Sequence, residues 1–390
     1  MATDTAAPTL RSDADLTDEQ QDFARAIRDF CRRELGGGKL EQLTNNFEDP
    51  HSDETARKMA DLGWYGLTID EQYGGSGGTF SDATLFLEET THGRAPIGAY
   101  GVTLIVVGAL NKFGTEEQKQ DLLGRVARGG TLAIAMSEPD SGSDVASLKT
   151  TARREDGEWV LNGSKMWCSF AHKASHVLIV CRTQDTGNPH EGMSMVFVPR
   201  DAPGFTVTPI KTLGGEETNE LHMEDVRVPE SALLGTEGAG WTQLMAGLNN
   251  ERVILAATAL GLAQRAFDDA LAYAKERRQF GRPIGTFQAI QHKFAGLATD
   301  LAQCRLLIRW VARLTDEDPM RMLPQEASMA KLSATELAKR CALEGMQIMG
   351  GYGYASEYPM ERYLRTAVVT TIYGGTSEIQ KNIIAKTLGL

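Results

Sequence analysis

The sequence predicts a protein of the α+β class, in which a helical segment, a strand-rich segment and a second helical segment follow one another. Apolar residues recur at helical spacing over about residues 16–128. Short alternating runs bounded by turn residues then fill about residues 131–229, and helical periodicity returns after them. We therefore expect an N-terminal helical domain at residues 1–130, a middle antiparallel β-domain at 131–238 and a C-terminal helical domain at 239–390.

Length, charge and cysteine usage narrow the class of protein. A chain of 390 residues is too long for one small core. A net charge of -12 argues against nucleic acid or an anionic membrane surface as the main partner, because both are polyanions. No apolar stretch reads as a signal peptide or a membrane-spanning helix, and the 5 cysteines form no CxxC pair. We expect a cytoplasmic protein with reduced thiols.

The N-terminal segment opens with a clear amphipathic helix. In LTDEQQDFARAIRDFCRREL the apolar residues fall on one face, and Thr17 or Asp18 can cap the start. Two glycine clusters, at residues 36–39 and 73–78, punctuate the region and predict flexible connections between helices.

The strand-rich segment carries two informative stretches. The loop at residues 135–150, AMSEPDSGSDVASLKT, has small residues and hydroxyls whose backbone N-H groups can cradle anionic or carbonyl oxygens. In SKMWCSF, Trp167 and Ser169 stand two apart on a strand and so share one face of the sheet. An indole and a hydroxyl suit a planar heteroaromatic ring, although Trp167 taken alone is more typical of a core aromatic.

The helix that starts near residue 241 holds one carboxylate in its apolar stripe. Stepping by four and three gives leucines and alanines, except that Glu251 stands where another leucine is expected. A carboxylate among apolar neighbours suits a general base. An ion pair with the adjacent Arg252 is the alternative.

Other patterns carry less function. A P-loop and a GxGxxG turn in the required context are absent from the sequence, and His172 and His176 lack the carboxylate of a zinc motif, so we expect no metal. Arg305, Arg309 and Arg313 form a stripe that predicts a solvated or intersubunit face.

Several motifs together resemble the acyl-CoA dehydrogenase family, and the resemblance covers nearly the whole chain. These motifs are MSEPDSGSD, KMWCS, LNNERVILAATALGLAQRAF, YAKERRQFGRPIGTFQAIQ, QIMGGYGYASEYPMERYLR and IYGGTSEIQKNIIA. The resemblance implies the acyl-CoA dehydrogenase fold: an N-terminal helical domain, a middle β-domain and a C-terminal four-helix bundle, with FAD between the last two. It also implies a homotetramer in which a neighbouring subunit completes the FAD site.

The implied reaction is α,β-desaturation of an acyl-CoA thioester, as in β-oxidation of fatty acids. A glutamate removes the α-proton, a hydride passes from Cβ to flavin N5, and electrons continue to electron-transferring flavoprotein. A backbone N-H of the IYxGT stretch and a flavin hydroxyl stabilise the thioester oxygen, a role that requires preorganised donors.

Residue by residue, the resemblance implies a set of contacts. The positions that match flavin contacts are Ile134, Met136, Ser137, Ser143, Trp167, Ser169, Arg277, Gln279, Phe280, Gln288, Gln347, Gly351, Thr376 and Glu378. The positions that match substrate contacts are Ser143, Thr183, Asn249, Arg252, Tyr373, Gly374, Gly375 and Lys386.

The chain departs from the family at the position of the catalytic base. Medium-chain and short-chain members read IYEGT, and this chain has Gly374 in place of that glutamate. The long-chain and isovaleryl-CoA enzymes keep the base on a bundle helix before an arginine, which matches Glu251 and Arg252. With Tyr373, the arrangement resembles the long-chain type. Glu251 is therefore the predicted catalytic base.

Three alternatives stay open at this stage. The same scaffold also serves acyl-CoA oxidases and other FAD enzymes, and a subunit of a heteromeric dehydrogenase would share most motifs. The identity of the acyl chain is equally open: Arg94 lies in the region that shapes the acyl cavity in the family, and a carboxylated tail is one candidate partner for it.

Overall fold

The computed structural model describes residue 13 and residues 15–44 and 49–390. The prediction that the N-terminus holds no signal peptide concerns residues that lie mostly outside this range. The described chain folds into two compact units. We call residues 37–83 and 96–251 the sheet unit, and the described part of residues 1–36 with residues 84–95 and 252–390 the bundle unit.

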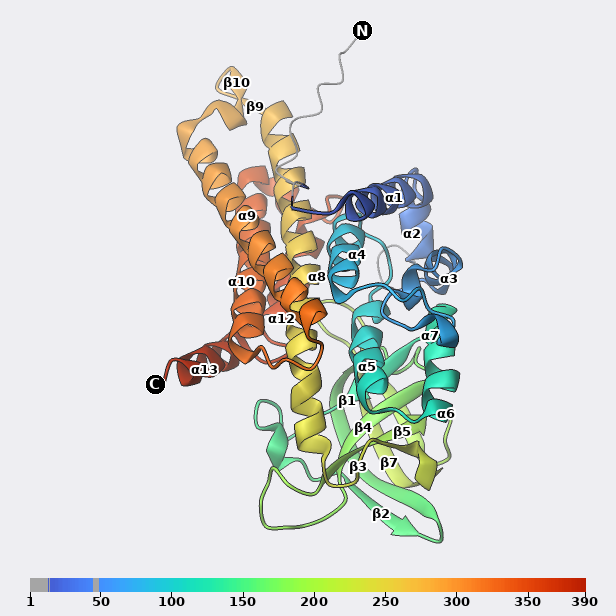
Figure 1. Ribbon diagram of the computed structural model, residues 1–390. Helices are drawn as coiled ribbons and strands as arrows, with labels where there is room; N and C mark the ends of the chain where they lie inside the picture. The colour runs from blue at the N-terminus through green and yellow to red at the C-terminus, as the bar shows by residue number, and fades with distance from the viewer. Residues whose placement is uncertain (1–12, 14, 45–48) are drawn as a thin grey trace. The chain divides into compact units, whose positions relative to one another are not determined.

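Helices form one layer of the sheet unit (Figure 1). They are α2 (Lys39–Leu43), α3 (Asp53–Asp61), α5 (Ala99–Phe113), α6 (Glu116–Gln118) and α7 (Gly124–Ala127). The glycine cluster at residues 73–78 among them is a tight turn and not the flexible connection expected from sequence. Gly77 and Gly78 donate backbone hydrogen bonds to Ile69 and Leu67, and a Cβ at Gly75 would lie 2.0 Å from the Ile69 carbonyl oxygen.

The strands of the sheet unit join one sheet in the order β6-β7-β3-β2-β4-β5-β8, with β1 against β4. Their bounds are β1 (Leu132–Ala135), β2 (Thr151–Glu155), β3 (Glu158–Ser169), β4 (His176–Arg182), β5 (Met193–Pro199), β6 (Phe205–Ile210), β7 (Thr218–Pro229) and β8 (Leu233–Leu234). Most neighbours are antiparallel, as predicted. The β1 and β4 strands are parallel, because the chain between them first makes the β2-β3 hairpin.

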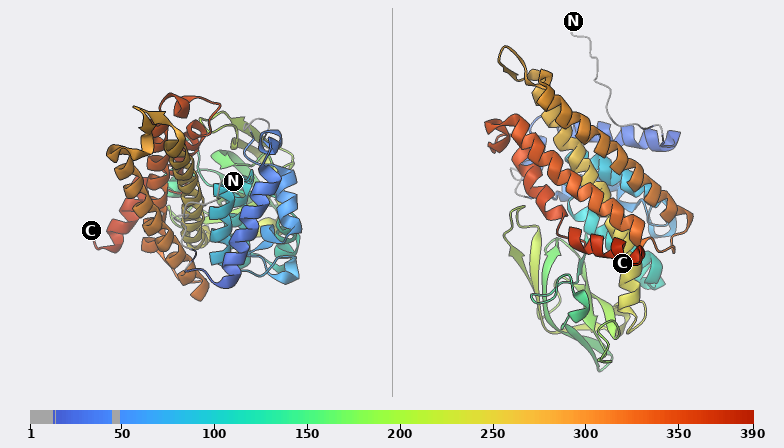
Figure 2. Two further views of the ribbon diagram at one scale, coloured as in Figure 1. Left: turned by 90° about the horizontal axis from the view of Figure 1, so that it is seen from above. Right: turned by 90° about the vertical axis from the view of Figure 1, so that its left-hand side faces the viewer.

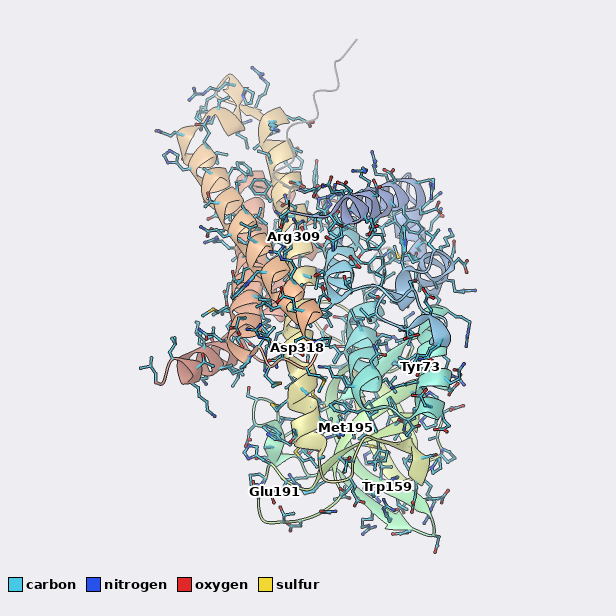
Figure 3. All side chains as sticks on the ribbon, viewed as in Figure 1. Tyr73, Trp159, Glu191, Met195, Arg309 and Asp318 are labelled. Carbon is cyan, nitrogen blue, oxygen red and sulfur yellow. The ribbon has the colours of Figure 1, made fainter. Side chains whose placement is uncertain are left out.

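Burial on both faces explains why β4 and β5 read as continuous apolar runs. One face of these strands joins α5 and the start of α8 in a core that contains Met195 (Figure 3). The other face shares a second core with β3 and β7, and that core contains Trp159. By contrast, β7 alternates between buried and exposed positions, as a strand with one solvated face does.

Long helices make up most of the bundle unit. The elements are α1 (Asp18–Leu35), α9 (Gln288–Glu317), α10 (Pro324–Met349), α11 (Gly351–Tyr354), α12 (Met360–Thr370), α13 (Ser377–Thr387) and the hairpin strands β9 (Arg278–Gln279) and β10 (Arg282–Pro283). Two further helices, α4 (Phe80–His92) and α8 (Gly240–Glu276), begin in the sheet unit. The four-helix bundle consists of α8, α9, α10 and α12 (Figure 2): α10 packs against α9 and α12, and hydrogen bonds join α8 to Arg305 on α9 and to Tyr363 on α12. Thr17 caps α1 through a capping box with Gln20.

The arginine stripe on α9 is not a solvated face, so this expectation was wrong for two of its three members. The Nε of buried Arg305 lies 2.8 Å from Oε1 of buried Glu88 on α4. Arg309, labelled in Figure 3, pairs with Asp15, and only Arg313 is exposed. Carboxylates from distant parts of the chain, Glu88 on α4 and Asp15 just before α1, therefore explain the first two arginines, which a single helical pattern could not reveal.

Three further findings concern the described residues. None of the described helices is both long and apolar enough for a membrane crossing. No group of three or more His, Cys, Asp or Glu side chains in this part of the chain is placed to hold a metal ion. All 5 cysteines are buried and free.

Candidate active site

The loop between β1 and β2 is held in place by one buried ion pair. Lys165 Nζ lies 2.8 Å from Oε1 of Glu138, and these side chains are 0% and 7% exposed. Lys165 also donates to the Met136 carbonyl, and Glu138 accepts from the backbone N-H groups of Lys149 and Thr150. Although burial alone raises the pKa of the Glu138 carboxyl, Lys165 and these hydrogen bonds hold it below its usual value. The pair thus ties both ends of the loop to β3.

The same contacts bring two predicted flavin segments together. The backbone N-H of Met166 donates to the Ser137 carbonyl at 2.9 Å, and the Cys168 thiol donates to the Ile134 carbonyl at 3.3 Å. Residues of the loop and residues of β3 are therefore neighbours in space. Ser143 is exposed further along this loop.

Trp167 is turned out of the sheet and is not a core aromatic. A register shift between Lys165 and Cys168 marks a bulge, and Trp167 adopts a φ of 63°, which is uncommon for a bulky residue. Its side chain is 57% exposed, Cys168 is buried, and Ser169 is partly exposed. The indole and Ser169 are therefore both accessible to solvent, although the bulge interrupts the regular alternation from which the sequence prediction was made.

A small pocket of about 170 Å³ lies beside this loop. Its lining residues are Glu138, Pro139, Asp140, Ser141, Ser147, Lys149, Thr150, Gly163 and Ser164. Asp140 forms an exposed ion pair with Lys149 at 3.5 Å. Such an exposed pair contributes little to stability.

Two predicted substrate contacts and the predicted base lie on α8 and are buried. Asn249, Glu251 and Arg252 are 5%, 5% and 9% exposed. Burying a carboxylate and a guanidinium is costly unless both are paired or hydrogen-bonded. The position of Glu251 in the apolar stripe is therefore a real structural feature of the helix. Thr183, the remaining substrate position of the sheet unit, exchanges a hydrogen bond with the Ser194 hydroxyl at 2.8 Å.

Most of the predicted flavin residues of the bundle unit lie near the β9-β10 hairpin and the α10-α11 junction, whereas Thr376 and Glu378 lie at the start of α13. Arg277, Gln279, Phe280 and Gln288 lie in or next to the β9-β10 hairpin and are all exposed, Phe280 at 92%. The Arg277 guanidinium lies 5.5 Å from the ring centre of Tyr352 on α11. Gln347, near the end of α10, and Gly351, the first residue of α11, are also exposed.

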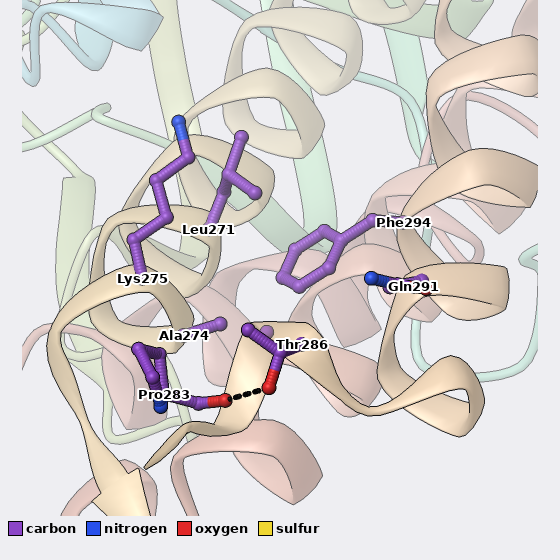
Figure 4. A pocket seen from close by; sticks show the side chains of 8 residues that line it. Leu271, Ala274, Lys275, Pro283, Thr286, Gln291 and Phe294 are labelled. Carbon is purple, nitrogen blue, oxygen red and sulfur yellow. Dashed lines mark hydrogen bonds between the residues drawn. The ribbon is translucent and has the colours of Figure 1, made fainter.

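A mostly apolar pocket of about 420 Å³ lies on the inner side of this hairpin (Figure 4). It is lined by Leu271, Ala274, Lys275, Pro283, Gly285, Thr286, Gln291 and Phe294. The Thr286 hydroxyl donates to the Pro283 carbonyl at 2.7 Å and so closes the turn at its rim. None of these lining residues belongs to the predicted flavin set.

The turn between α12 and α13 carries the two glycines that replace the familiar base motif. Gly374 and Gly375 have φ values of 59° and 80°, in the left-handed region that glycine tolerates best. Thr376 caps α13 by accepting from the Ile379 N-H, and Glu378 is exposed in the first turn of that helix. Tyr373 is partly exposed at this turn, whereas Lys386 is exposed near the other end of α13.

Two buried side chains that the sequence analysis missed hold this turn. Lys331 Nζ donates to the Gly375 carbonyl at 2.8 Å, and Gln380 Nε2 donates to the carbonyls of Gly374 and Gly375 at 3.0 and 2.9 Å. Both side chains are 0% exposed. The sequence does contain one sign of such a buried side chain, because Lys331 lies on the apolar face of α10. Lys165, within an apolar strand, shows the same pattern.

Arg94, the open candidate for a carboxylated substrate tail, lies close to Tyr363 and Arg362 within the bundle unit. Burial and Asp269 raise the pKa of Tyr363 to about 12, and Arg94 opposes this shift. Arg94 is partly exposed and belongs to the bundle unit.

The residues described here fit FAD by the chemistry of their groups. An exposed indole, a neighbouring hydroxyl and a backbone-rich loop suit an isoalloxazine ring, because such a ring needs a stacking surface and a few hydrogen bonds. The exposed arginine and glutamines at the bundle end supply donors of the kind that bind a pyrophosphate. The set is split between the two units.

Comparisons with known proteins agree with these features. Models of the acyl-CoA dehydrogenase N-terminal, middle and C-terminal domains match residues 17–130, 133–226 and 238–389. An acyl-CoA dehydrogenase of Bacillus subtilis is 40% identical over 380 residues, which cover 96% of this chain and 98% of that protein. An acryloyl-CoA reductase (NADH) of Anaerotignum propionicum is 38% identical over 387 residues, covering 96% of each chain.

Solved structures give the same result. An acyl-CoA dehydrogenase of Geobacillus kaustophilus has a TM-score of 0.89 and 35% identity, with 96% of this chain and 99% of that chain covered. A glutaryl-CoA dehydrogenase of Mycobacterium smegmatis, at 29% identity and a TM-score of 0.87 over 97% and 96% of the chains, was solved in complex with FADH2. The chain therefore belongs to the acyl-CoA dehydrogenases, a family of FAD-dependent oxidoreductases.

Proposed function

We propose that this acyl-CoA dehydrogenase desaturates an acyl-CoA thioester between Cα and Cβ and that Glu251 is the catalytic base. The observation that supports this proposal is the combination of amino acids at two positions. Residue 374 is a glycine and offers no carboxylate, whereas Glu251 on α8 is 95% removed from solvent in an apolar stripe. A buried acid is expensive to keep and is retained where chemistry or pairing requires it.

The task of the base is to remove a proton that is only weakly acidic. An α-proton beside a thioester becomes removable when the developing negative charge on the carbonyl oxygen meets preorganised donors. A carboxylate of the chain must then be aimed at Cα within the bound complex, and correct alignment contributes several kcal/mol to the lowering of the barrier, on the order of 7–11 in the best cases. The bound FAD supplies the acceptor for the hydride that leaves Cβ.

Several residues of the chain would hold FAD. We assign the ring contacts to the loop from Ile134 to Ser143, with Met136 and Ser137, and to Trp167 and Ser169. We assign the remaining contacts to Arg277, Gln279, Phe280, Gln288, Gln347, Gly351, Thr376 and Glu378. The exposure of the hairpin residues in a single chain supports the idea that they serve the FAD of a neighbouring subunit in a homotetramer.

The acyl-CoA itself would contact Ser143, Thr183, Asn249, Arg252, Tyr373, Gly374, Gly375 and Lys386. Domain limits at 131 and 239, a cytoplasmic location, a role in β-oxidation and electron transfer to electron-transferring flavoprotein belong to the same proposal. They rest on the family resemblance.

The decisive experiment replaces the base. In Glu251→Gln we expect FAD content and absorbance to match the wild type, while anaerobic flavin bleaching by substrate is lost. The control is Glu317→Gln, which makes the same chemical change at an exposed carboxylate and should bleach normally. Near-normal bleaching in Glu251→Gln would overturn the assignment of the base.

The substrate is best found with a panel of straight, branched, aromatic and dicarboxylic acyl-CoAs, each tested for anaerobic bleaching. The reverse direction belongs in the same screen, because a reductase is among the similar proteins. Rapid reoxidation of the bleached flavin by O2 would favour an oxidase. A native mass below that of a homotetramer, with less than one FAD per chain, would favour a heteromeric enzyme.

A further inference from the structure

The turn at residues 373–376 owes its shape to side chains from two helices beneath it. Lys331 comes from α10 and Gln380 from α13, and both are fully buried. Their hydrogen bonds end on the carbonyl oxygens of Gly374 and Gly375. The contacts lie entirely within the bundle unit.

The orientation of the Gln380 amide follows from these contacts. Its Nε2 faces two carbonyl oxygens, and the opposite amide orientation would place Oε1 against the same oxygens. Its Oε1 is buried without a hydrogen-bond partner among the described residues. The side chain therefore serves the turn as a donor, at the expense of its own acceptor.

Holding the carbonyls also fixes the N-H groups of the turn. A trans peptide unit is planar and its N-H points opposite to its C=O. With the carbonyls of Gly374 and Gly375 directed at Lys331 and Gln380, the N-H groups of Gly375 and Thr376 point to the other, partly exposed side. Successive N-H groups directed to one side form a site for a negatively charged oxygen.

Two adjacent glycines would otherwise leave this segment loose. Glycine loses more backbone freedom on ordering than any other residue, so a Gly-Gly pair needs external contacts to keep one conformation. The neighbouring residues add such contacts: the Ser377 hydroxyl donates to Glu336 on α10 at 2.6 Å, and the Ser377 N-H donates to the Thr371 carbonyl at 3.0 Å.

We propose that Lys331 and Gln380 are positioning residues of the active site, which hold the Gly374-Gly375 turn so that its backbone N-H groups meet the thioester carbonyl. They act through the turn and touch neither substrate nor flavin. This inference rests on the proposed function, since it needs a thioester carbonyl that develops negative charge.

The test uses the holoenzyme with Lys331→Met and Gln380→Met. Both substitutions replace a buried polar side chain with an apolar one of similar length. Gln380→Met is the safer of the two for folding, because it also removes the unsatisfied Oε1. Leu337→Ala on the same helix is the control, since it lowers stability through a cavity at a buried residue outside the turn network.

We expect kcat with the best thioester of the panel to fall about 10-fold to 100-fold in both Met variants, the size of loss caused by misplacement of about 1 Å. FAD content should stay near the wild-type value. Leu337→Ala should lose thermal stability but keep its kcat. The contrast separates positioning from a general loss of stability.

A binding measurement isolates the carbonyl. Crotonyl-CoA carries a thioester carbonyl, butyl-CoA has a thioether in its place, and the oxidised enzyme can turn over neither. In the Met variants the Kd for crotonyl-CoA should rise about 10-fold, the effect of one hydrogen bond of about 1.4 kcal/mol, while the Kd for butyl-CoA should stay unchanged.

The outcomes separate this inference from the proposed function. If no thioester binds to the wild-type enzyme or bleaches its flavin, the proposed function fails and the positioning role fails with it. Suppose instead that the wild type is active. If both Met variants then keep their kcat, or if the Kd values for crotonyl-CoA and butyl-CoA rise equally, only the role of Lys331 and Gln380 is overturned.

Discussion

Replacing Lys165 with methionine should destabilise the sheet unit by about 3 kcal/mol at pH 7. The change removes the ammonium that pairs with Glu138 inside the fold, where the two side chains are 0% and 7% exposed. Breaking a buried ion pair by deleting one partner costs about 3–5 kcal/mol, because the other charge stays buried. Glu138 keeps two backbone N-H donors, from Lys149 and Thr150, which places the cost near the lower end.

We also predict how the loss of stability in Lys165→Met changes with pH. In the wild type the pKa of Glu138 lies below its usual value, so its contribution to stability is present above the unfolded pKa and is lost as pH falls. Without Lys165, burial dominates and the pKa of Glu138 should rise. Protonation then relieves the buried charge, and the stability deficit of Lys165→Met should shrink between pH 7 and pH 5.

The assay is equilibrium urea unfolding followed by tryptophan fluorescence. Trp64, Trp159, Trp167 and Trp241 lie in the sheet unit, so the signal reports mainly on that unit. The matched control is the double variant Lys165→Met with Glu138→Gln, which removes the stranded charge and should recover part of the loss. A deficit below about 0.5 kcal/mol, typical of surface changes, or a double variant no more stable than the single one, would refute the reasoning.

Three other predictions concern buried groups. Burial lowers the pKa of His51 to about 4, so stability should rise from pH 4 to about 6.5 by up to roughly 3 kcal/mol, and this slope should be absent in His51→Gln when unfolding is followed across pH. Arg305→Met removes the guanidinium that pairs with buried Glu88 on α4 and should cost about 3–5 kcal/mol in urea unfolding; Arg313→Met, at the exposed end of the same stripe, should cost less than about 0.5 kcal/mol, and equal losses would contradict the burial argument. A thiol reagent should modify almost none of the 5 cysteines in the native protein and all of them in urea, since each thiol is buried; rapid native labelling would count against this packing.

The sequence predicted most of the local structure correctly because that structure depends on short-range patterns. Helical spacing marked α1, α8 and α9, and alternation with turn pairs marked the hairpin of β2 and β3. It could not show the bulge at Trp167, which interrupts the alternation of the strand. Flexibility at the glycine cluster of residues 73–78 was wrong, because glycine content does not reveal whether another backbone segment packs against it.

Long-range partners explain the remaining errors and omissions. The sequence pattern of α9 could not distinguish Arg305, which meets a buried carboxylate, from Arg313, which meets solvent. In the same way, the sequence analysis assigned no role to Lys165 or Lys331, although each is fully buried and holds a loop or a turn.

The amino-acid sequence by itself determined the class of protein, the order of helical and strand-rich segments, and the residue types available for chemistry, including a glycine at 374 and an acid at 251. Those properties can be recognised from the periodicity of apolar residues and from motifs that span only a few residues. Only the tertiary structure decided which polar side chains are buried and which backbone groups they hold, as Lys331 and Gln380 hold the Gly374-Gly375 turn. Burial and hydrogen bonding depend on segments far apart in the chain, and no local pattern records where those segments meet.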